Sequence, residues 1–289
     1  MTELHYYYRI EISTLSDIIQ EVCKAIWICL EDECRGQPSK KRWLEISERF
    51  LKKSDFHNCI GAIEGKHVRV VKPKHSGSLY YNYKHYCSIQ LLAICDDNYC
   101  FTYVDIGDFG KNNDASIYNN SRFNKKLQAG TLNIPELHIY PEKNDCKMPF
   151  VLVGDEAFAL SNAMMRPCGG KDLPQNKTVF NNRLSRARRF IECSFGILTN
   201  KWRIFHRPLN VNIELAIDII KAFVVLHNFV RLRDVYLHEE SLSYTGLFEN
   251  KGNVLVPSRY TGTGPTAIRD YFTNYFVTDG TVPWQYRNM

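Results

Sequence analysis

The stretch "NCIGAIEGKHVRVVKP", residues 58–73, predicts the strand around which the fold is organised. An apolar run leads into the carboxylate Glu64, and the β-branched stretch Val68–Val71 follows shortly after it. Both halves are typical of a buried strand, which we place at residues 59–71. A charged carboxylate on such a strand is costly to bury unless another group pairs with it. The partner of Glu64 is therefore the first question that the sequence raises.

Predicted helices and strands continue on both sides of this segment. Periodic apolar residues and caps predict helices at about 13–35, 43–50, from Asp114 onward, 178–205, 213–232 and 267–276. Runs rich in apolar, β-branched and aromatic residues predict strands at 86–95, 99–107 and 148–155. This order is typical of an α/β domain with a mixed β-sheet flanked by helices, preceded by a small N-terminal helical lobe. We divide the chain into the lobe at 1–55, a central domain at 56–233 and a tail at 234–289.

The composition is that of a globular protein and excludes several other classes. Apolar residues make up 44% of the chain and charged residues 24%, which argues against a disordered protein. No run approaches the roughly 18 apolar residues of a membrane span, and the first residues lack the pattern of a signal peptide. The ten cysteines form no Cys-x-x-Cys pair, which argues against a zinc module. We therefore predict reduced, mostly buried cysteines in an intracellular protein.

Positive charge is concentrated in one segment, residues 177–207. This segment holds eight Lys and Arg residues and one Glu, a net charge of +7, whereas the whole chain carries +6. Such a concentration is typical of a surface that binds a polyanion, although a solvated basic helix face has the same composition. Under the first interpretation the predicted DNA contacts are Arg183, Arg186, Arg188, Arg189, Lys201 and Arg203.

Four carboxylates stand at positions that suit a catalytic site. Asp155 follows an apolar strand, and Glu64 occupies a similar strand-end position. Asp114 begins a predicted helix, and Glu192 borders the apolar face of another. Each has a plain structural explanation, because Asp residues cap turns and helices, and Glu192 can pair with a neighbouring arginine. Together, beside a basic segment, they fit a two-metal phosphodiesterase site in which carboxylates hold Mg²⁺.

Several motifs, taken in order, carry a resemblance to a known family. They are "GAIEGKHV" (61–68), "SGSLYYNYKHY" (76–86), "DIGDFGKNNDASIYNNS" (105–121), "VLVGDEAFAL" (151–160), "FNNRLSRARRFIECSFGILTNKWRIF" (180–205), "VLHNFVR" (225–231) and "RDYFTNYF" (269–276). On these motifs the chain resembles the DDE transposase domain of PIF/Harbinger elements and the nucleases derived from Harbinger transposases. The resemblance covers about residues 13–287.

The resemblance implies a ribonuclease-H-like fold and a metal-dependent DNA endonuclease. Two Mg²⁺ or Mn²⁺ ions would serve phosphodiester hydrolysis or strand transfer. Carried over residue by residue, the metal ligands fall on Glu64, Asp114, Asp155 and Glu192, of which Glu64, Asp155 and Glu192 would be catalytic. The resemblance also implies DNA as a partner, a Myb-like helper DNA-binding protein, and a location in the nucleus, alone or together with the cytoplasm. No membrane association is expected.

Two departures from the family pattern bear on this expectation. The family has Asp at the position of Glu64, and the extra methylene shifts a carboxylate that must meet the near-octahedral geometry of Mg²⁺. Family transposases also carry an N-terminal DNA-binding region upstream of the matching residues, so the lobe at 1–55 is expected to be a truncated remnant. The alternative function is a catalytically inactive DNA- or protein-binding module on the same fold.

Two expectations concern the geometry of the acids. Asp155 and Glu192 should lie within roughly 8 Å of each other, close enough for both to reach a shared metal. Glu64 should be paired with a divalent cation rather than with Lys66, because a flexible, hydrated lysine gains little from such a contact.

Aromatic and histidine side chains leave further interpretations open. Tyr80, Tyr81 and Tyr83 could stack on bases along a DNA groove or pack at the edge of the sheet. His67 lies close to Glu64 in sequence and could support it, although a packed histidine is the plainer interpretation. His227 is expected to be a packed helix residue.

Overall fold

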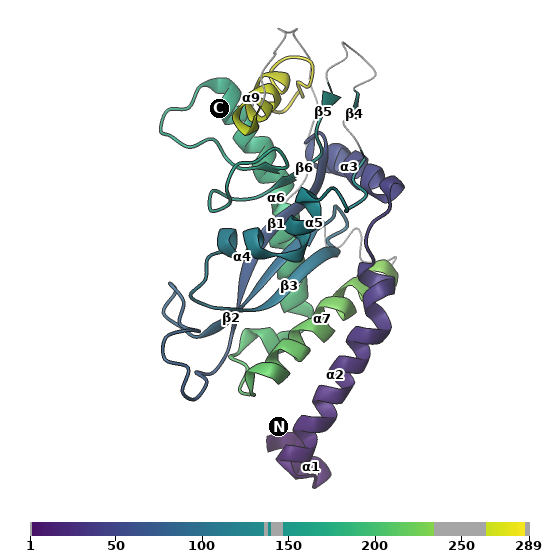
Figure 1. Cartoon of the computed structure of the whole chain (residues 1–289), viewed down its shortest axis with the longest axis vertical. Helices are drawn as coiled ribbons and strands as arrows, with labels where there is room; N and C mark the ends of the chain where they lie inside the picture. Colours follow the sequence, from purple (N-terminus) through teal and green to yellow (C-terminus); the bar gives the residue numbers. More distant parts are fainter. Residues whose placement is uncertain (1, 136–137, 140–146, 234–263, 287–289) are drawn as a thin grey trace.

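A five-stranded mixed sheet forms the centre of the computed structural model, which describes residues 2–135, 138–139, 147–233 and 264–286 (Figure 1). The strand order is β3-β2-β1-β6-β7. The bounds are β1 Cys59–Arg69, β2 Ser88–Cys95, β3 Phe101–Phe109, β6 Val151–Val153 and β7 Met164–Met165. β1, β2 and β3 are antiparallel neighbours, whereas β1, β6 and β7 run parallel. The sheet has ribonuclease-H-like order and direction, and the predicted α/β fold class is confirmed.

β1 is the middle strand, and its burial changes along its length. The residues from Cys59 to Ile63 are buried, whereas Glu64 and the three residues after it are half-buried. Glu64 pairs with Ala93 of β2, and the pairing continues as far as Arg69. The expectation that Glu64 ends a strand is therefore wrong. The carboxylate lies within the strand, because the residues after it go on pairing with β2.

Helices cover both faces of this sheet. Their bounds are α2 Ile12–Arg35, α3 Lys40–Ser54, α4 Asp114–Asn120, α5 Arg122–Gln128, α6 Gln175–Lys201 and α7 Ile213–Arg233. α4 and α5 lie on one side of the sheet, and α6 and α7 lie on the other (Figure 1). β2 is buried over its whole length, as expected for a strand with layers on both faces.

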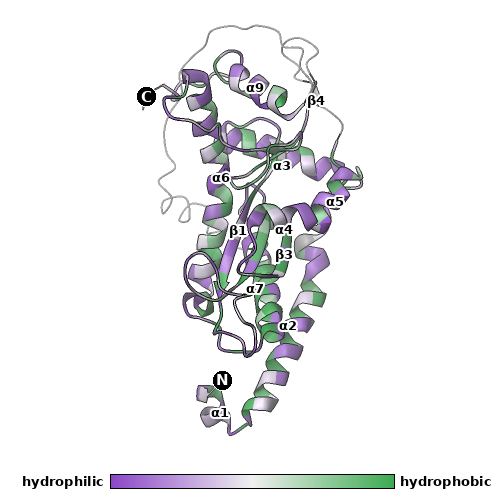
Figure 2. Ribbon diagram, turned by 60° about the vertical axis from the view of Figure 1, so that its left-hand side comes forward, coloured by the Kyte–Doolittle hydropathy of each residue, from purple (hydrophilic) through white to green (hydrophobic). Residues whose placement is uncertain are grey.

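The two long N-terminal helices were predicted from sequence and pack on the rest of the molecule. α2 lies along α7, and polar and apolar residues alternate on its ribbon (Figure 2). α3 places Trp43, Ile46 and Phe50 in the main core, where they are almost completely buried. The Trp43 indole also donates a hydrogen bond to the Leu132 carbonyl at 2.9 Å. The boundary of the predicted lobe, at residue 55, stays a prediction.

Short elements were the ones that sequence patterns missed. They are α1 Thr2–Tyr8, α5, β4 His138–Ile139, β5 Lys147–Met148, β7 and the 3₁₀ helix η1 Arg203–His206. The helix predicted in the tail is present as α9 Pro265–Tyr275, whereas residues 234–263 of that tail lie outside the described residues. The nine described cysteines are all free and mostly buried, as predicted. Each helix in the described ranges is too short or too polar to cross a membrane.

Arg183 joins α6 to the C-terminal segment from inside the protein. Its side chain is completely buried, and its guanidinium donates to the carbonyls of Asp55 at 3.1 Å and Gly280 at 2.6 Å. It also donates to the side chain of Gln285 and lies 4.5 Å from the centroid of the Phe276 ring. Arg183 is therefore a structural residue that ties three separate parts of the chain together.

We predict that Arg183→Ala lowers the free energy of unfolding by about 3 kcal/mol, because it leaves buried carbonyl groups without a donor. Urea denaturation followed by circular dichroism measures the effect. Ser185→Ala, at an exposed position on the same helix, is the control and should change stability by less than about 0.5 kcal/mol. Equal stability of the two variants would contradict the structural role of Arg183.

Candidate active site

The register of the sheet brings Glu64 and Asp155 side by side. β1 and β6 are parallel neighbours in which Ala62 pairs with Val153. Glu64 and Asp155 each lie two residues beyond that pair, at equivalent positions on adjacent chain segments. Because neighbouring strands are about 4.8 Å apart, the two backbones are held within reach of a shared ligand.

The turn after β6 fixes the position of Asp155. Gly154 lets this turn pack closely, because a Cβ atom there would lie 2.7 Å from Cδ2 of Phe158. The Asp155 carboxylate accepts a hydrogen bond from the backbone N–H of Ala157 at 3.0 Å. Asp155 therefore caps the turn, as its structural interpretation predicts, and still lies beside Glu64.

Arg188 of α6 answers the question of what pairs with Glu64. Its Nη2 atom lies 3.7 Å from Oε2 of Glu64 and 3.3 Å from Oε1 of Glu192. Lys66 is not the partner, as predicted, and its Nζ lies 5.5 Å from the centroid of the Phe195 ring. The partner in the structure is nevertheless an arginine, which the sequence interpretation did not consider. Oε2 of Glu64 is buried and makes no hydrogen bond among the described residues.

Glu64 is the acid whose ionisation is most strongly affected by this site. The pKa of Glu64 is raised to about 7, chiefly by burial; Arg188 lowers it, and the carboxylates of Glu192, Asp155 and Asp114 contribute to the rise. The four acids predicted from sequence are thus close enough to influence one another. The separation of roughly 8 Å expected between Asp155 and Glu192 stays a prediction.

Asp114 approaches the sheet from the face opposite to the Glu64 side chain. Successive side chains of a strand alternate between faces, and the Asp114 carboxylate lies against Gly65, where a Cβ atom would overlap it. Gln90 donates to Oδ1 of Asp114 at 2.9 Å. Burial and the neighbouring Asp155 raise the pKa of Asp114, whereas this hydrogen bond lowers it. The N-cap of α4 is Asn113, so Asp114 does not cap the helix.

The donor chemistry of the site fits a divalent metal. Glu64, Asp155 and Glu192 offer hard oxygen ligands, and the buried Oε2 of Glu64 lacks a hydrogen-bond donor. In the present arrangement, no group of three His, Cys, Asp or Glu side chains in the described part of the chain is placed to hold a metal ion. The Arg188 guanidinium lies where a cation would have to meet Glu64 and Glu192.

Fewer residues are available to form the basic surface on α6 than the sequence predicts. Arg183 is buried, so it cannot contact DNA, and its place in that surface is a wrong prediction. Arg186 pairs with Asp55 at 3.3 Å and stacks 4.0 Å from the centroid of the Trp284 ring. Both residues fasten α6 to other segments, which sequence periodicity along one helix does not reveal.

The remaining members of the predicted surface differ in their surroundings. Arg188 points at the acids, and Arg189 is half-buried. Lys201, at the end of α6, and Arg203, in η1, are exposed. The accessible charge of the segment is therefore gathered near the C-terminal end of α6.

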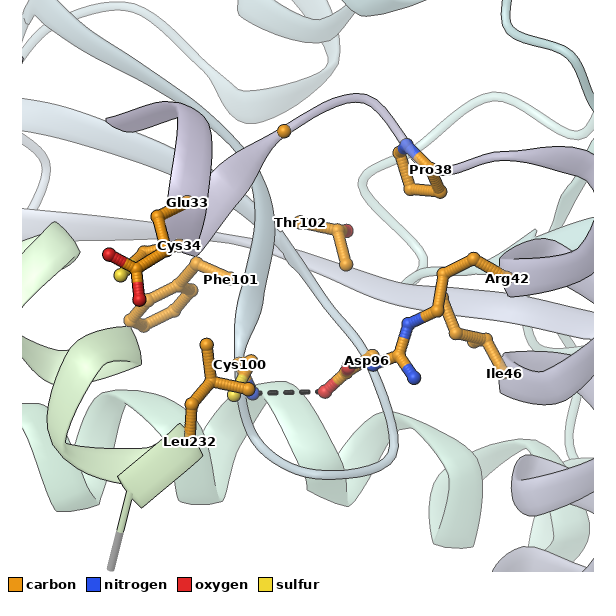
Figure 3. A pocket seen from close by; sticks show the side chains of 11 residues that line it. Glu33, Cys34, Pro38, Arg42, Ile46, Asp96, Cys100, Phe101, Thr102 and Leu232 are labelled. Carbon is orange, nitrogen blue, oxygen red and sulfur yellow. Dashed lines mark hydrogen bonds and ion pairs between the residues drawn. The ribbon is translucent and has the colours of Figure 1, made fainter. Parts of the chain in front are cut away.

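A pocket elsewhere in the molecule contains a carboxylate that is already neutralised. It lies where α2, α3 and the β2–β3 turn meet (Figure 3). Asp96 accepts a hydrogen bond from the backbone N–H of Cys100 at 3.0 Å and pairs with Arg42 at 3.0 Å. Its neighbour Asp97 pairs with Lys53 at 2.7 Å. These acids hold the turn in place and are bound by fixed cations, so we assign them no catalytic role.

Three residues that complete the site were missed at the sequence level. Arg188 was predicted as a DNA contact and as a surface partner of Glu192, four residues away, but not as a partner of Glu64, because that contact depends on the packing of α6 against β1. Gly65 and Gln90 position Asp114. The adjacent glycine in "EGK" was a signal, since glycine in a strand often marks the close approach of another group.

The fold and the site together define the class of protein. A sheet of ribonuclease-H-like strand order carries one acid on its middle strand, a second after the parallel neighbouring strand and a third on a facing helix. Residues 63–228 match the family described as "DDE superfamily endonuclease", and the chain belongs to this family. With its motifs, this makes the domain a DDE transposase domain of the Harbinger type.

A named relative supports the same assignment. "Protein ALP1-like" from Arabidopsis thaliana is 29% identical over 204 residues, which covers 69% of this chain and 50% of the relative. The chain thus spans about half the length of this relative. No solved structure matches the chain.

We predict that Glu64 makes the stability of the protein depend on pH. Its pKa is about 7 in the folded protein instead of 4.5, so the folded state binds more protons than the unfolded state between these values. The free energy of unfolding should therefore fall as the pH rises from about 4.5 to 7, by at most about 3 kcal/mol from this group. Glu64→Gln should remove this loss, and urea denaturation at pH 5, 6, 7 and 8 measures it.

The control is Glu48→Gln on the exposed side of α3, which removes one negative charge without touching the site. Its pH dependence should match that of the parent protein. If the Glu64→Gln curve also follows the parent, burial does not shift the Glu64 carboxyl.

Proposed function

We propose that this chain is a divalent-metal-dependent DNA endonuclease domain whose catalytic residues are Glu64, Asp155 and Glu192. The observation that carries the proposal is the meeting of these acids from β1, the β6 turn and α6, with Oε2 of Glu64 buried and without a hydrogen bond. A buried, unsatisfied polar atom costs about 1–3 kcal/mol, and more when it is charged. A ligand bound between these acids would satisfy the Glu64 atom.

The residues that would hold Mg²⁺ or Mn²⁺ are Glu64, Asp155 and Glu192, with Asp114 reaching Asp155 from the other face of the sheet. Two bound ions would activate a water or hydroxyl and stabilise the leaving oxygen in phosphodiester hydrolysis or strand transfer. The strand register fixes the first two acids relative to each other, and Glu192, which is exposed, completes the set from α6. Arg188 has to release Glu64 and Glu192 before they can bind a metal.

The substrate that we propose is DNA. The exposed Lys201 and Arg203 are suited to contact phosphates, with the half-buried Arg189 beside them. Because the proposed substrate is chromosomal, we propose a location in the nucleus, alone or together with the cytoplasm. A Myb-like helper protein would supply recognition of specific DNA sequences, and no membrane partner is proposed.

A second function is favoured by one specific observation. Glu64 stands where the family has Asp, and it is already paired with Arg188. An ion pair that persists would leave a catalytically inactive module that binds DNA or another protein on the same fold. The two functions differ in one measurable property, which is metal binding at Glu64.

We predict that Glu64→Asp increases Mg²⁺-dependent nicking of supercoiled plasmid and that Glu64→Ala abolishes it. Aspartate restores the family geometry, whereas alanine removes a ligand. Isothermal titration calorimetry with Mn²⁺ should show at least tenfold weaker binding to Glu64→Ala. Arg188→Gln removes the competing cation and should instead strengthen Mn²⁺ binding. Equal Mn²⁺ affinity of Glu64→Ala and the parent would exclude Glu64 as a ligand and favour the inactive module.

We predict that the double variant Lys201→Ala/Arg203→Ala weakens binding to all duplex sequences alike. Removing two phosphate contacts should reduce the slope of log K against log salt by about 2, because each contact releases about one counterion. Fluorescence anisotropy with labelled duplexes in Ca²⁺ buffer at several salt concentrations measures this slope. The control Lys40→Ala/Lys41→Ala removes the same charge at the exposed start of α3. If both double variants lower the slope equally, the slope depends on the net charge of the protein, and phosphate contacts by Lys201 and Arg203 are excluded.

A further inference from the structure

The segment between β1 and β2, residues 70–87, presents aromatic and basic side chains on the surface; we call it the Tyr83 loop. Tyr83 is 74% exposed and Tyr81 is 48% exposed, whereas Tyr80 packs 5.2 Å from the ring centroid of Phe109. The two interpretations of these tyrosines, packing at the sheet edge and stacking on bases, therefore apply to different residues. Tyr80 is a packing residue, and Tyr81 and Tyr83 face solvent.

Charge in this part of the chain has one sign. Residues 65–95 contain five Lys and Arg residues and no Asp or Glu. Within the Tyr83 loop, Lys72, Lys74 and Lys84 are exposed, and Nζ of Lys84 lies 5.4 Å from the centroid of the Tyr83 ring. A cation beside an exposed ring can hold a phosphate while the ring contacts the attached base. An exposed ring with a neighbouring cation is therefore suited to bind a nucleotide.

Asn82 holds the tip of the loop in one conformation. Its side chain is buried, accepts hydrogen bonds from the backbone N–H groups of Lys84 and Tyr86, and donates to Oγ of Ser88 at 2.9 Å. The adjacent Tyr81 and Cys87 form an antiparallel bridge. The exposed rings are therefore carried by an ordered turn, and little conformational entropy is lost when a ligand binds to them.

The loop is joined to the strand that carries Glu64. Nδ1 of His67 lies 2.8 Å from Oγ of Ser88, and the His67 ring centroid lies 5.5 Å from that of Tyr83. His67 is three residues after Glu64 on β1, about 10 Å along the strand, and its side chain lies on the opposite face of the sheet, the face that Asp114 approaches. At about 3.4 Å per nucleotide of one strand, the distance along β1 from Glu64 to His67, beside which Tyr83 lies, corresponds to roughly three nucleotides.

We propose that the Tyr83 loop binds unpaired nucleotides of the DNA substrate, with Tyr83 stacking on a base about three nucleotides from the cleaved position. The inference rests on the proposed nuclease function and names the form of DNA that the site takes. Bases inside a duplex are already stacked on both neighbours, so an exposed ring stacks more readily on an unpaired base, where no base step has to be opened. Cations beside aromatic rings are the usual composition of surfaces that bind single strands.

The experiment measures binding without cleavage. Fluorescence anisotropy in EDTA compares a single-stranded oligonucleotide, a blunt duplex and a duplex with an unpaired tail. Tyr83→Ala should weaken binding of the two DNAs with unpaired bases by about 5- to 150-fold, the effect of losing one stacked base. It should change binding of the blunt duplex by less than about twofold. Tyr83→Phe keeps the ring and should bind as the parent protein does.

Tyr7→Ala is the matched control, because Tyr7 is 81% exposed on α1, far along the chain from the loop. A 2-aminopurine base in the unpaired tail gives a second readout, since stacking on Tyr83 quenches its fluorescence. Unchanged affinity of Tyr83→Ala for unpaired DNA, or an equal loss for blunt duplex, would overturn the inference. Failure to bind any DNA would also overturn it. Loss of nicking with Tyr83-dependent binding intact would count against the nuclease function alone.

Discussion

The Glu64 carboxylate lies on the middle strand of the sheet, beside a strand that is buried over its whole length. The cost of placing charge there is the constraint on which the rest of the site depends. Glu192 and Asp155 add like charge to the same space, and each makes ionisation of Glu64 less favourable. Helix α6, which packs against β1, brings Arg188 to these acids and so offsets part of this cost.

The molecule contains a second acidic cluster that is neutralised differently. Asp96 and Asp97 are completely or almost completely buried, and they pair with Arg42, Arg49 and Lys53. The cations there outnumber the two acids, so the negative charge of this cluster is neutralised without a ligand. At Glu64 the ion pairs of the described residues supply one guanidinium to several carboxylates. A divalent cation would therefore be stabilised more at the Glu64 cluster, where negative charge exceeds positive charge, than at Asp96 and Asp97.

Sequence patterns predicted the features that depend on neighbouring residues. The periodicity of apolar residues located α2, α6, α7 and the main strands, and acids at strand ends, at a helix start and on a helix face led to the four carboxylates. What they could not supply was the register between distant segments. The adjacency of Glu64 and Asp155 follows from the pairing of β1 with β6, and the position of Asp114 depends on which face of β1 it meets. Arg183 looked like a surface charge because its partners lie more than ninety residues away.

The replacement of the family aspartate by Glu64 connects the two proposed functions. Glu64 reaches Arg188 at 3.7 Å. An aspartate would end one C–C bond earlier, about 1.5 Å, so its carboxylate would lie further from Arg188 in the observed position of the guanidinium. The same methylene that displaces the carboxylate from the family geometry therefore creates its contact with Arg188. The two proposed functions would then differ in the direction that the Glu64 side chain takes: toward Arg188 on α6, or toward Asp155 in the turn after β6. A substrate phosphate or a metal ion that attracts either partner changes that balance, because both are held by a long, weak contact.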